Sequence, residues 1–254
     1  GARVTDLRGR TAVITGGNSG LGLAMAAGIG AAGARVVIWA RDPGRSADAL
    51  TRLRAEGVQA EAVRCDVTDE GNVRSAMERT LELAPAVDCV VANAGVAAAV
   101  PLIDTSLAQW HEVTRTNLDG TFLTVREAAR HMVQRGDGGS IVIVSSLAAR
   151  YGAAQQAAYA SSKSALLGLG RTVAVELARY SVRCNVLLPG WTRTRMNEHL
   201  QHDERFVRAA TARTPVRRWA EPDEFRAVAA FLAAPTLTFH TGCDVVVDGG
   251  YSVF

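Results

Sequence analysis

Short apolar runs alternate with longer amphipathic segments along the 254-residue chain. The runs are rich in β-branched residues and lack polar–apolar alternation, which is typical of parallel strands covered on both faces. We expect seven strands, at Arg10–Ile14, Ala34–Trp39, Val58–Cys65, Val87–Ala92, Ser140–Val144, Val182–Leu188 and Cys243–Val247. We expect helices between them, at Leu21–Ala32, Arg45–Glu56, Asn72–Leu83, Gln109–Arg135, Tyr159–Tyr180 and Pro222–Ala234. The alternation predicts an α/β fold with a doubly wound parallel sheet.

No Pro- or Ser-rich linker and no internal repeat divides the sequence, so residues 1–254 are expected to form a single domain. The least regular segment is 190–218, which is rich in arginine and threonine and follows the sixth predicted strand. Ligands of open α/β sheets bind beyond the carboxyl ends of the strands. The segment is therefore predicted to be a substrate lid, and an ordinary pair of surface helices is the alternative.

Composition excludes several classes of protein. With 48% hydrophobic and 21% charged residues, the chain is neither collagen-like, disordered nor a coiled coil. Its apolar runs fall short of the ~18 residues of a membrane span, and residues 1–10 are too polar for a signal peptide. We expect a cytoplasmic protein that binds no membrane. Its 28 basic and 25 acidic residues are interspersed, so nucleic-acid binding is not expected.

Metal ions and disulfides are not expected either. The four cysteines lie far apart, and three of them lie in or beside predicted strands, so we interpret them as buried thiols. His199 and His202 have the spacing of ligands on a helix, but no third ligand accompanies them.

A glycine-rich turn, Thr15-Gly-Gly-Asn-Ser-Gly-Leu-Gly22, follows the first predicted strand and precedes a predicted helix. Glycines permit a tight turn and a close approach to a pyrophosphate, and the helix N-terminus offers free N–H groups. The turn predicts a Rossmann-type dinucleotide site, and a purely structural turn is the alternative. Its predicted binding residues are Gly16, Asn18, Ser19, Gly20, Leu21 and Gly22.

The end of the second predicted strand bears on which dinucleotide is bound. Folds that bind NAD usually have an acidic residue there, which binds the ribose hydroxyls. Here Ala40 is followed by Arg41, and an arginine can bind a 2′-phosphate through paired, charged hydrogen bonds. We predict NADP(H), with Arg41 as the main anchor and Arg45 as a second candidate. The alternative is NAD(H), with Asp42 on the ribose.

Two further strand ends fit the same cleft. Asp66 and Val67 follow the third strand, where Asp66 could accept a hydrogen bond from an adenine amino group. Asn93, Ala94 and Gly95 follow the fourth, and their small size would let a cofactor lie against the backbone. Ordinary turn chemistry is the alternative for both.

Tyr159 and Lys163 lie four residues apart at the start of a predicted helix, hence on one face of it. Lys163 is the only lysine among 28 basic residues, so its position should require something that a guanidinium cannot do. Ser146 lies 13 residues before Tyr159, just beyond the fifth strand. These residues are expected to meet at the carboxyl edge of the sheet.

With these motifs, the chain resembles the short-chain dehydrogenase/reductase family over nearly its whole length. Asn117 in Thr116-Asn-Leu-Asp-Gly120, Pro189-Gly190 with Thr194, and Val247-Asp-Gly-Gly250 complete the match. The resemblance implies that Tyr159 is the general acid or base and that Ser146 binds the substrate oxygen. It also implies that Lys163 holds the nicotinamide ribose and lowers the pKa of Tyr159, and that Asn117 steadies a water. A homotetramer is a further implication.

The resemblance also assigns the rest of the cleft. Pro189, Gly190, Thr192 and Thr194 would border the nicotinamide carboxamide, although the family usually has an aliphatic residue where Thr192 stands. The substrate pocket would be lined by Ser146, Tyr151, Gln155, Tyr159 and Trp191.

We therefore expect an NADP(H)-dependent oxidoreductase that interconverts a ketone and a secondary alcohol. An NAD-dependent sugar or steroid alcohol dehydrogenase is one alternative, and a catalytically silent nucleotide-sensing regulator is another. The four-residue spacing of Tyr159 and Lys163 disfavours an enoyl reductase. Four arginines of the predicted lid could bind an anionic substrate, and the alternative is that they are ordinary solvated surface residues. They are Arg193, Arg195, Arg205 and Arg208.

Overall fold

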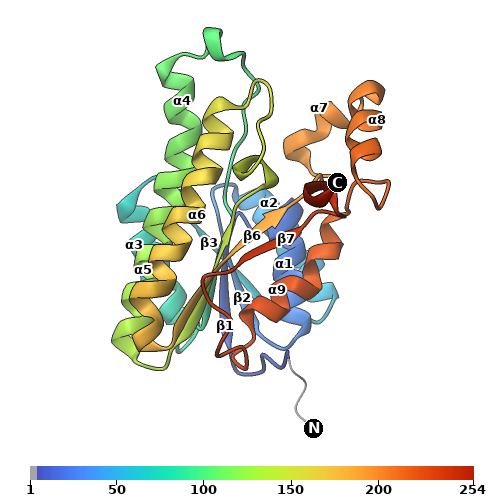
Figure 1. Cartoon of the computed structure of the whole chain (residues 1–254). Helices are drawn as coiled ribbons and strands as arrows, with labels where there is room; N and C mark the ends of the chain where they lie inside the picture. The colour runs from blue at the N-terminus through green and yellow to red at the C-terminus, as the bar shows by residue number, and fades with distance from the viewer. Residues whose placement is uncertain (1–4) are drawn as a thin grey trace.

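The computed structural model describes residues 5–254, which form one sheet of seven parallel strands (Figure 1). Its spatial order is β3-β2-β1-β4-β5-β6-β7. The strands are β1 (Thr11–Thr15), β2 (Arg35–Ala40), β3 (Ala60–Arg64), β4 (Cys89–Ala92), β5 (Gly139–Val144), β6 (Val182–Pro189) and β7 (Asp244–Val247). The predicted fold class is confirmed, and each strand begins and ends within two residues of its expected bounds.

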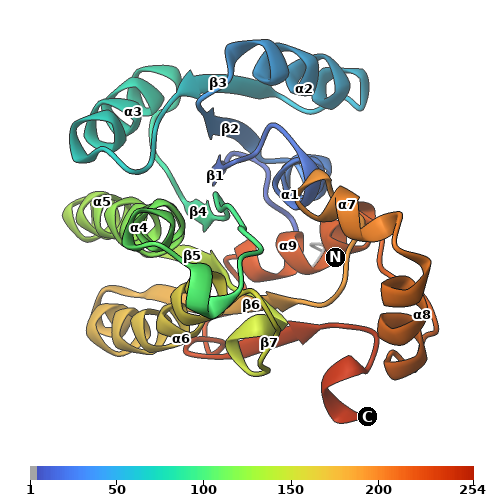
Figure 2. The same cartoon turned by 90° about the horizontal axis from the view of Figure 1, so that it is seen from above.

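Helices cover both faces of the sheet, as Figure 2 shows from above. One face carries α1 (Gly20–Ala31), α2 (Pro43–Ala55) and α9 (Arg226–Ala233). The other carries α3 (Glu70–Leu83), α5 (Gly120–Arg135) and α6 (Ala157–Leu177), and α4 (Leu107–Thr114) lies beside α6. Each face has its own apolar core, so the strands are buried on both sides, as their continuous apolar sequences predicted.

The expected helix Gln109–Arg135 is wrong in one respect, because it is not continuous. A π-helical turn at Arg115–Asp119 separates α4 from α5, and the N–H of Gly120 donates to the carbonyl of Arg115, five residues earlier. A π-turn adds one residue to a helix without interrupting its apolar face, so hydrophobic periodicity does not reveal it. This turn contains Asn117, whose side chain is fully buried.

The connection from β6 to β7 differs in hand from the other five. Strands β4 to β6 follow one another along the sheet on one side of β1, and the helices that connect them lie on the α3 face. Strands β2 and β3 extend the sheet on the other side of β1, and their connecting helices lie on the α1 face. Strand β7 continues in the direction of β4 to β6, yet α9 lies on the α1 face. The β6–β7 crossover is therefore left-handed. About 98% of such crossovers are right-handed, so this one is an exception.

The long β6–β7 connection includes the predicted lid. Segment 190–218 contains a 3₁₀ turn (Arg195–Asn197), α7 (Glu198–Gln201) and α8 (Glu204–Arg213). Both figures show α8 beside the carboxyl end of the described chain, where a last 3₁₀ turn spans Tyr251–Val253. The lid therefore lies close to residues that follow β7.

Cys65, Cys89 and Cys184 are buried free thiols, as expected, while Cys243 is exposed. Among residues 5–254, no helix combines the length and the apolar character that crossing a membrane requires.

Candidate active site

The ends of β4 and β5 and the first turns of α6 bring the expected catalytic residues together. The Lys163 ammonium lies 5.8 Å from the centre of the Tyr159 ring and donates a 2.9 Å hydrogen bond to the carbonyl of Val144, the last residue of β5. Ser146 follows two residues later and shares a side-chain hydrogen bond with Tyr159. A phenol, a hydroxyl and an ammonium thus form one cluster beyond the carboxyl end of β5.

Burial sets the protonation of this cluster. It raises the pKa of Tyr159, and the hydrogen bond with Ser146 opposes this only in part. Burial also lowers the pKa of Lys163 to about 8. In the protein alone, Tyr159 is therefore a neutral phenol at pH 7. The family resemblance implies a lowered pKa for this tyrosine, and reaching it requires further positive charge nearby.

The side chain of Asn117 joins three segments of the chain. Its Oδ1 accepts the N–H of Val96 (2.8 Å), and its Nδ2 donates to the Val96 carbonyl (2.9 Å) and to Ser162 Oγ (3.2 Å). Ser162 in turn donates to the carbonyl of Tyr159 (2.8 Å). Asn117 thereby links the segment after β4, at Val96, to the first turns of α6, at Ser162. Sequence reasoning assigned no role to Ser162, and only the fold shows that it links Asn117 to the carbonyl of Tyr159.

The glycine-rich turn is built by backbone contacts too close for any side chain. A Cβ atom at Gly22 would lie 2.4 Å from the Gly16 carbonyl oxygen, and Gly16 itself has a φ of +64°. Thr15 Oγ1 accepts the N–H groups of both Asn93 (2.9 Å) and Ala94 (3.0 Å), which joins the ends of β1 and β4. The expected residues around the turn are therefore neighbours in space.

The N-terminus of α1 presents an open cradle. Ser19 occupies the N-cap position, and its side chain makes no capping hydrogen bond. Gly20 has a φ of +50°, and a Cβ there would meet only Thr194, at 3.5 Å. Leu21 is the second residue of the helix and is partly buried. Open space at a helix N-terminus suits the pyrophosphate of a dinucleotide.

Arg41 and Asp42, at the end of β2, behave differently. Asp42 caps α2 by accepting the N–H of Arg45 (3.1 Å), and its carboxylate also pairs with the Arg45 side chain (3.2 Å). Arg41 is exposed, and its guanidinium forms no hydrogen bond or ion pair with any residue from 5 to 254. Asn18 Nδ2 lies 3.4 Å from the Asp42 carbonyl. Because the Asp42 carboxylate already binds the N–H and the side chain of Arg45, it is less suited to the alternative role of binding the ribose hydroxyls of NAD(H).

Asp66 and Val67 lie next to this region. Burial raises the pKa of Asp66, but hydrogen bonds from the N–H and hydroxyl of Thr68, together with the charge of Arg41, outweigh it, so the net shift is downward. Val67 is buried against Gly120, where a Cβ would lie 2.7 Å from Val67 Cγ2. At the end of β4, a Cβ on Gly95 would meet Asn117 Oδ1 at 3.2 Å.

On the opposite side of the cleft, one unexpected residue holds the loop after β6. Asn197 Nδ2 donates to the carbonyl of Thr192 (2.8 Å), and its Oδ1 accepts the N–H of Thr194 (3.1 Å). The Thr192 hydroxyl donates to the Gly190 carbonyl (3.0 Å), and the Gly190 N–H, directly after Pro189, donates to Val247 (2.9 Å). The expected carboxamide-binding loop is thereby fastened to the end of β7.

The three further substrate candidates have different surroundings. Trp191 packs against Phe206 of α8 and against Trp219, directly after the predicted lid, with ring centres 5.0 and 5.3 Å away. The Tyr151 hydroxyl donates to the carbonyl of Ser252 (2.7 Å). Gln155 is exposed and has a φ of +65°, a strained conformation outside glycine.

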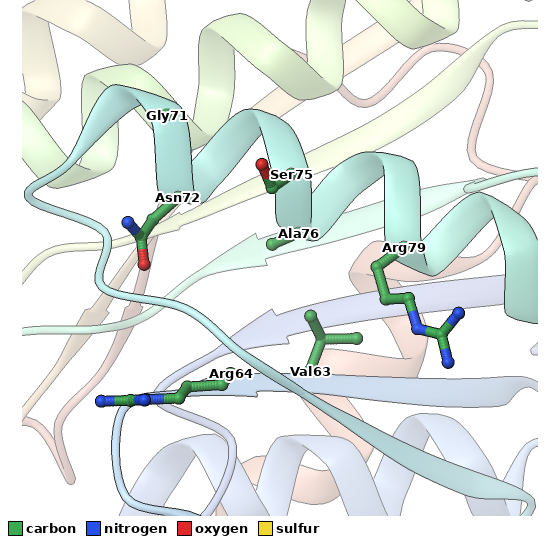
Figure 3. Close-up of a pocket in the computed structure, with 7 residues that line it drawn as sticks. All are labelled: Val63, Arg64, Gly71, Asn72, Ser75, Ala76 and Arg79. Carbon is green, nitrogen blue, oxygen red and sulfur yellow. The ribbon is translucent and has the colours of Figure 1, made fainter.

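Two hollows lie away from this cluster. A groove of about 390 Å³ runs between β3 and α3, where Arg64 and Arg79 point away from each other (Figure 3) and Arg79 is paired with Glu82. Another, of about 400 Å³, lies at the amino ends of β5 and β6. There Arg135 and Arg183 donate to main-chain carbonyls. Neither hollow presents converging groups that await a ligand. Within residues 5–254, no cluster of three or more His, Cys, Asp or Glu side chains could hold a metal ion.

Comparison with known proteins bears on this geometry. A family model described as "Enoyl-(Acyl carrier protein) reductase" matches residues 16–252. The cis-4-hydroxycyclohexanecarboxylate dehydrogenase of Sinomonas cyclohexanicum is 39% identical over 245 residues, which cover 96% of each chain. The L-rhamnose 1-dehydrogenase (NAD(P)(+)) of Azotobacter vinelandii is 36% identical over 249 residues, covering 96% of this chain and 97% of its own.

A solved structure agrees closely with the fold. The gluconate 5-dehydrogenase of Burkholderia cenocepacia J2315, in complex with NADP and tartrate, superposes with a TM-score of 0.94 at 35% identity. The match covers 99% of this chain and 100% of the other. The relatives are named dehydrogenases, which confirms the expectation of an oxidoreductase.

Proposed function

Because the chain belongs to the short-chain dehydrogenase/reductase family, we propose that it interconverts a ketone and a secondary alcohol with NADP(H) as coenzyme. The observation that carries this proposal is the cluster of Ser146, Tyr159 and Lys163 at the carboxyl end of β5. The cluster places a proton donor, a hydrogen-bonding hydroxyl and a buried cation around one point.

The coenzyme assignment is supported by the fit of the cleft. The open cradle at Gly20 and the N-terminus of α1 suits a pyrophosphate. Arg41, whose guanidinium forms no hydrogen bond or ion pair within residues 5–254, would bind the 2′-phosphate. Ala40 occupies the position at which a carboxylate would repel that phosphate. Asp66, Val67, Asn93, Ala94 and Gly95 would border the adenine and ribose. The NADP bound to the gluconate 5-dehydrogenase of known structure supports the same choice.

NADP(H) would supply or accept the hydride. In reduction, Tyr159 would donate its hydroxyl proton to the carbonyl oxygen while Ser146 donates a hydrogen bond to the same oxygen. Lys163 would favour the resulting phenolate, and the positive charge of the oxidised nicotinamide would add to this effect. Asn117 would steady a water between Lys163 and solvent, while its side chain holds Val96 and Ser162 in place.

The alternatives are less well supported. A four-residue separation of Tyr159 and Lys163 disfavours enoyl reduction, whatever the description of the matching family model. The engagement of Asp42 in the cap of α2 disfavours an NAD-specific ribose site. A silent nucleotide sensor would not need Asn117, Ser146, Tyr159 and Lys163 together.

The proposal extends to location and assembly. Three buried free thiols suit the reducing cytoplasm. We place a mobile substrate lid at 190–218 within the single domain 1–254. A homotetramer is supported by the exposed apolar side chains of Phe122 on α5 and Val175 on α6, on the outer surface of one helical layer.

Parallel titration of the coenzyme-free protein with NADPH and NADH tests the coenzyme assignment. We expect micromolar binding of NADPH and much weaker binding of NADH. Equal or tighter NADH binding would replace the NADP assignment by NAD, and binding of neither would refute the enzymatic proposal.

Tyr159→Phe tests the catalytic proposal. Removal of the phenolic proton donor should lower kcat by about 10²–10⁴-fold. NADPH binding and the thermal unfolding midpoint should stay close to those of the unmodified protein. Turnover above a few per cent in a folded, coenzyme-binding variant would refute the role of Tyr159.

A further inference from the structure

Arg213 stands between two tyrosine rings. Its guanidinium carbon lies 4.3 Å from the centre of the Tyr251 ring and 5.1 Å from that of Tyr151. The two rings meet edge to face at 79°, with centres 6.3 Å apart, and the Tyr151 hydroxyl is fixed by its hydrogen bond to Ser252. Three remote segments therefore meet at this cation: the end of α8, the loop after β5 and the turn after β7.

Arg213 lacks the acidic partner that two other arginines of this region have. Arg193 pairs with Glu221 (3.2 Å), and Arg218 forms a two-point pair with Glu224 (2.6 and 2.7 Å). The guanidinium of Arg213 forms neither a hydrogen bond nor an ion pair with any residue between 5 and 254. Within the described residues, its guanidinium makes only cation–π contacts, with the rings of Tyr151 and Tyr251.

Such an arrangement leaves the hydrogen-bonding groups of the guanidinium available. Stacking on aromatic rings uses the face of the guanidinium plane, whereas its N–H groups lie along the edge and match the two oxygens of a carboxylate. The position is also relevant, because Tyr151 follows Ser146 by five residues in the loop beyond β5. The cation therefore contacts the same loop that carries Ser146 of the proposed catalytic cluster.

We propose that Arg213 binds a carboxylate group of the substrate, with Tyr151 and Tyr251 holding the guanidinium in place. The substrates are then ketones and secondary alcohols that also carry a carboxylate. This inference rests on the proposed function. The relatives do not decide it, since cis-4-hydroxycyclohexanecarboxylate is an acid and L-rhamnose is a neutral sugar.

The test compares acids with neutral counterparts of similar shape. One pair is cis-4-hydroxycyclohexanecarboxylate and its methyl ester, and the other is D-gluconate and D-glucitol. Binding of each compound to the enzyme–NADP⁺ complex is measured by calorimetry, and oxidation is followed by NADPH formation. We expect the unmodified enzyme to bind and oxidise at least one acid in preference to its neutral counterpart.

Arg213→Ala should raise KM and Kd for that acid about 10–100-fold, the range for a hydrogen bond to a charged group, and leave those for the neutral compound unchanged. Arg213→Lys keeps the charge and should recover part of the loss. Arg179→Ala is the matched control, because Arg179 also stacks on a tyrosine ring, that of Tyr180 at 4.7 Å, but lies in the turn that follows α6; its constants should not change.

Three results would overturn the inference: no binding of either acid by the unmodified enzyme, no preference over the neutral counterparts, or an equal effect of Arg213→Ala on both members of a pair. The last result would make Arg213 a contact that only supports the lid. The binding measurement needs no turnover, so the inference can fail or stand separately from the catalytic role of Tyr159.

Discussion

The coenzyme side of the molecule, residues 11–95, and the substrate side, residues 190–254, are held together by different kinds of contact. On the coenzyme side, backbone approaches backbone so closely that a Cβ would overlap the Gly16 carbonyl oxygen at Gly22 or the Ile14 carbonyl oxygen at Gly17. On the substrate side, main-chain bonds such as that from Gly190 to Val247 are joined by many side-chain connections, through the rings around Trp191, the amide of Asn197 and exposed ion pairs.

This difference teaches how the fold can keep one cofactor and vary its substrates. Contacts between backbone atoms fix the shape of the coenzyme cleft whatever the nearby side chains are. Contacts between side chains change with every substitution, and exposed ion pairs contribute little to stability. The substrate side is therefore the part of the molecule where new specificity can be introduced without unfolding the sheet.

Gly22→Ala should show the largest effect on the coenzyme side. The added methyl would lie 2.4 Å from the Gly16 carbonyl oxygen and 2.5 Å from Asn93 Nδ2, so the turn must move. Overpacking of this kind destabilises by about 1–3 kcal/mol, and we expect NADPH affinity to fall about 100-fold. Thermal unfolding and coenzyme titration measure the two effects.

The matched control is Gly168→Ala, in α6. Gly168 is also helical, but no atom lies within 4 Å of the position of its Cβ. We expect a gain of about 0.5–1 kcal/mol in the free energy of unfolding and unchanged NADPH affinity. Unaltered coenzyme binding by Gly22→Ala would contradict the assignment of a rigid, backbone-built cleft.

Arg41→Ala should have a smaller and more selective effect. If Arg41 binds the 2′-phosphate, its loss weakens NADPH binding about 10–100-fold and leaves NADH binding unchanged. Arg52→Ala, an exposed arginine of α2, serves as the control for a general change of charge. An unchanged ratio of NADPH to NADH affinity would exclude Arg41 as the anchor.

Lys163 lies between the two sides and gives the smallest of these effects, a pH dependence of stability. Its pKa falls from 10.5 to about 8 in the folded protein, so the unfolded chain binds more protons between these pH values. The free energy of unfolding therefore rises with pH through this group, and the full penalty of burying its charge is present below pH 8.

Lys163→Met removes the buried charge. The coenzyme-free variant should be more stable than the unmodified protein at pH 7, and the difference should shrink by about 1–2 kcal/mol at pH 9.5. Denaturant unfolding at both pH values measures it. Above pH 10 the raised pKa of Tyr159 acts in the opposite direction, so the comparison stays below that value. A constant difference would show that Lys163 is not the titrating group.

The sheet could be predicted from the sequence because its strands are buried on both faces and therefore read as continuous apolar runs. The positions of Ser146, Tyr159 and Lys163 could be predicted too, because their spacing fixes them on one strand end and one helix face. The π-turn around Asn117 could not, since one added residue leaves the apolar face of the helix intact.

Most residues that sequence reasoning missed act through contacts between separate elements. Ser162 meets Asn117, and Arg213 meets the rings of Tyr151 and Tyr251, which only folding brings together. Asn197 holds Thr192 and Thr194 of its own loop, where the sequence does not show which polar side chain makes the contacts. The arginines chosen in advance as possible anion ligands include Arg193 and Arg208, which lie beside glutamates. Spacing along one element is visible in a sequence, whereas pairing between separate elements is not.

The left-handed return through α9 has a consequence for biosynthesis. Helix α1 packs directly on α9, so closely that a Cβ at Gly28 would lie 2.3 Å from the Arg226 carbonyl oxygen. Nearly 200 residues separate these two positions. While the chain is being translated, the part of the α1 surface that packs on α9 has no cover until Ala233 has left the ribosome. The nascent protein must therefore keep that surface from aggregating until α9 has been made.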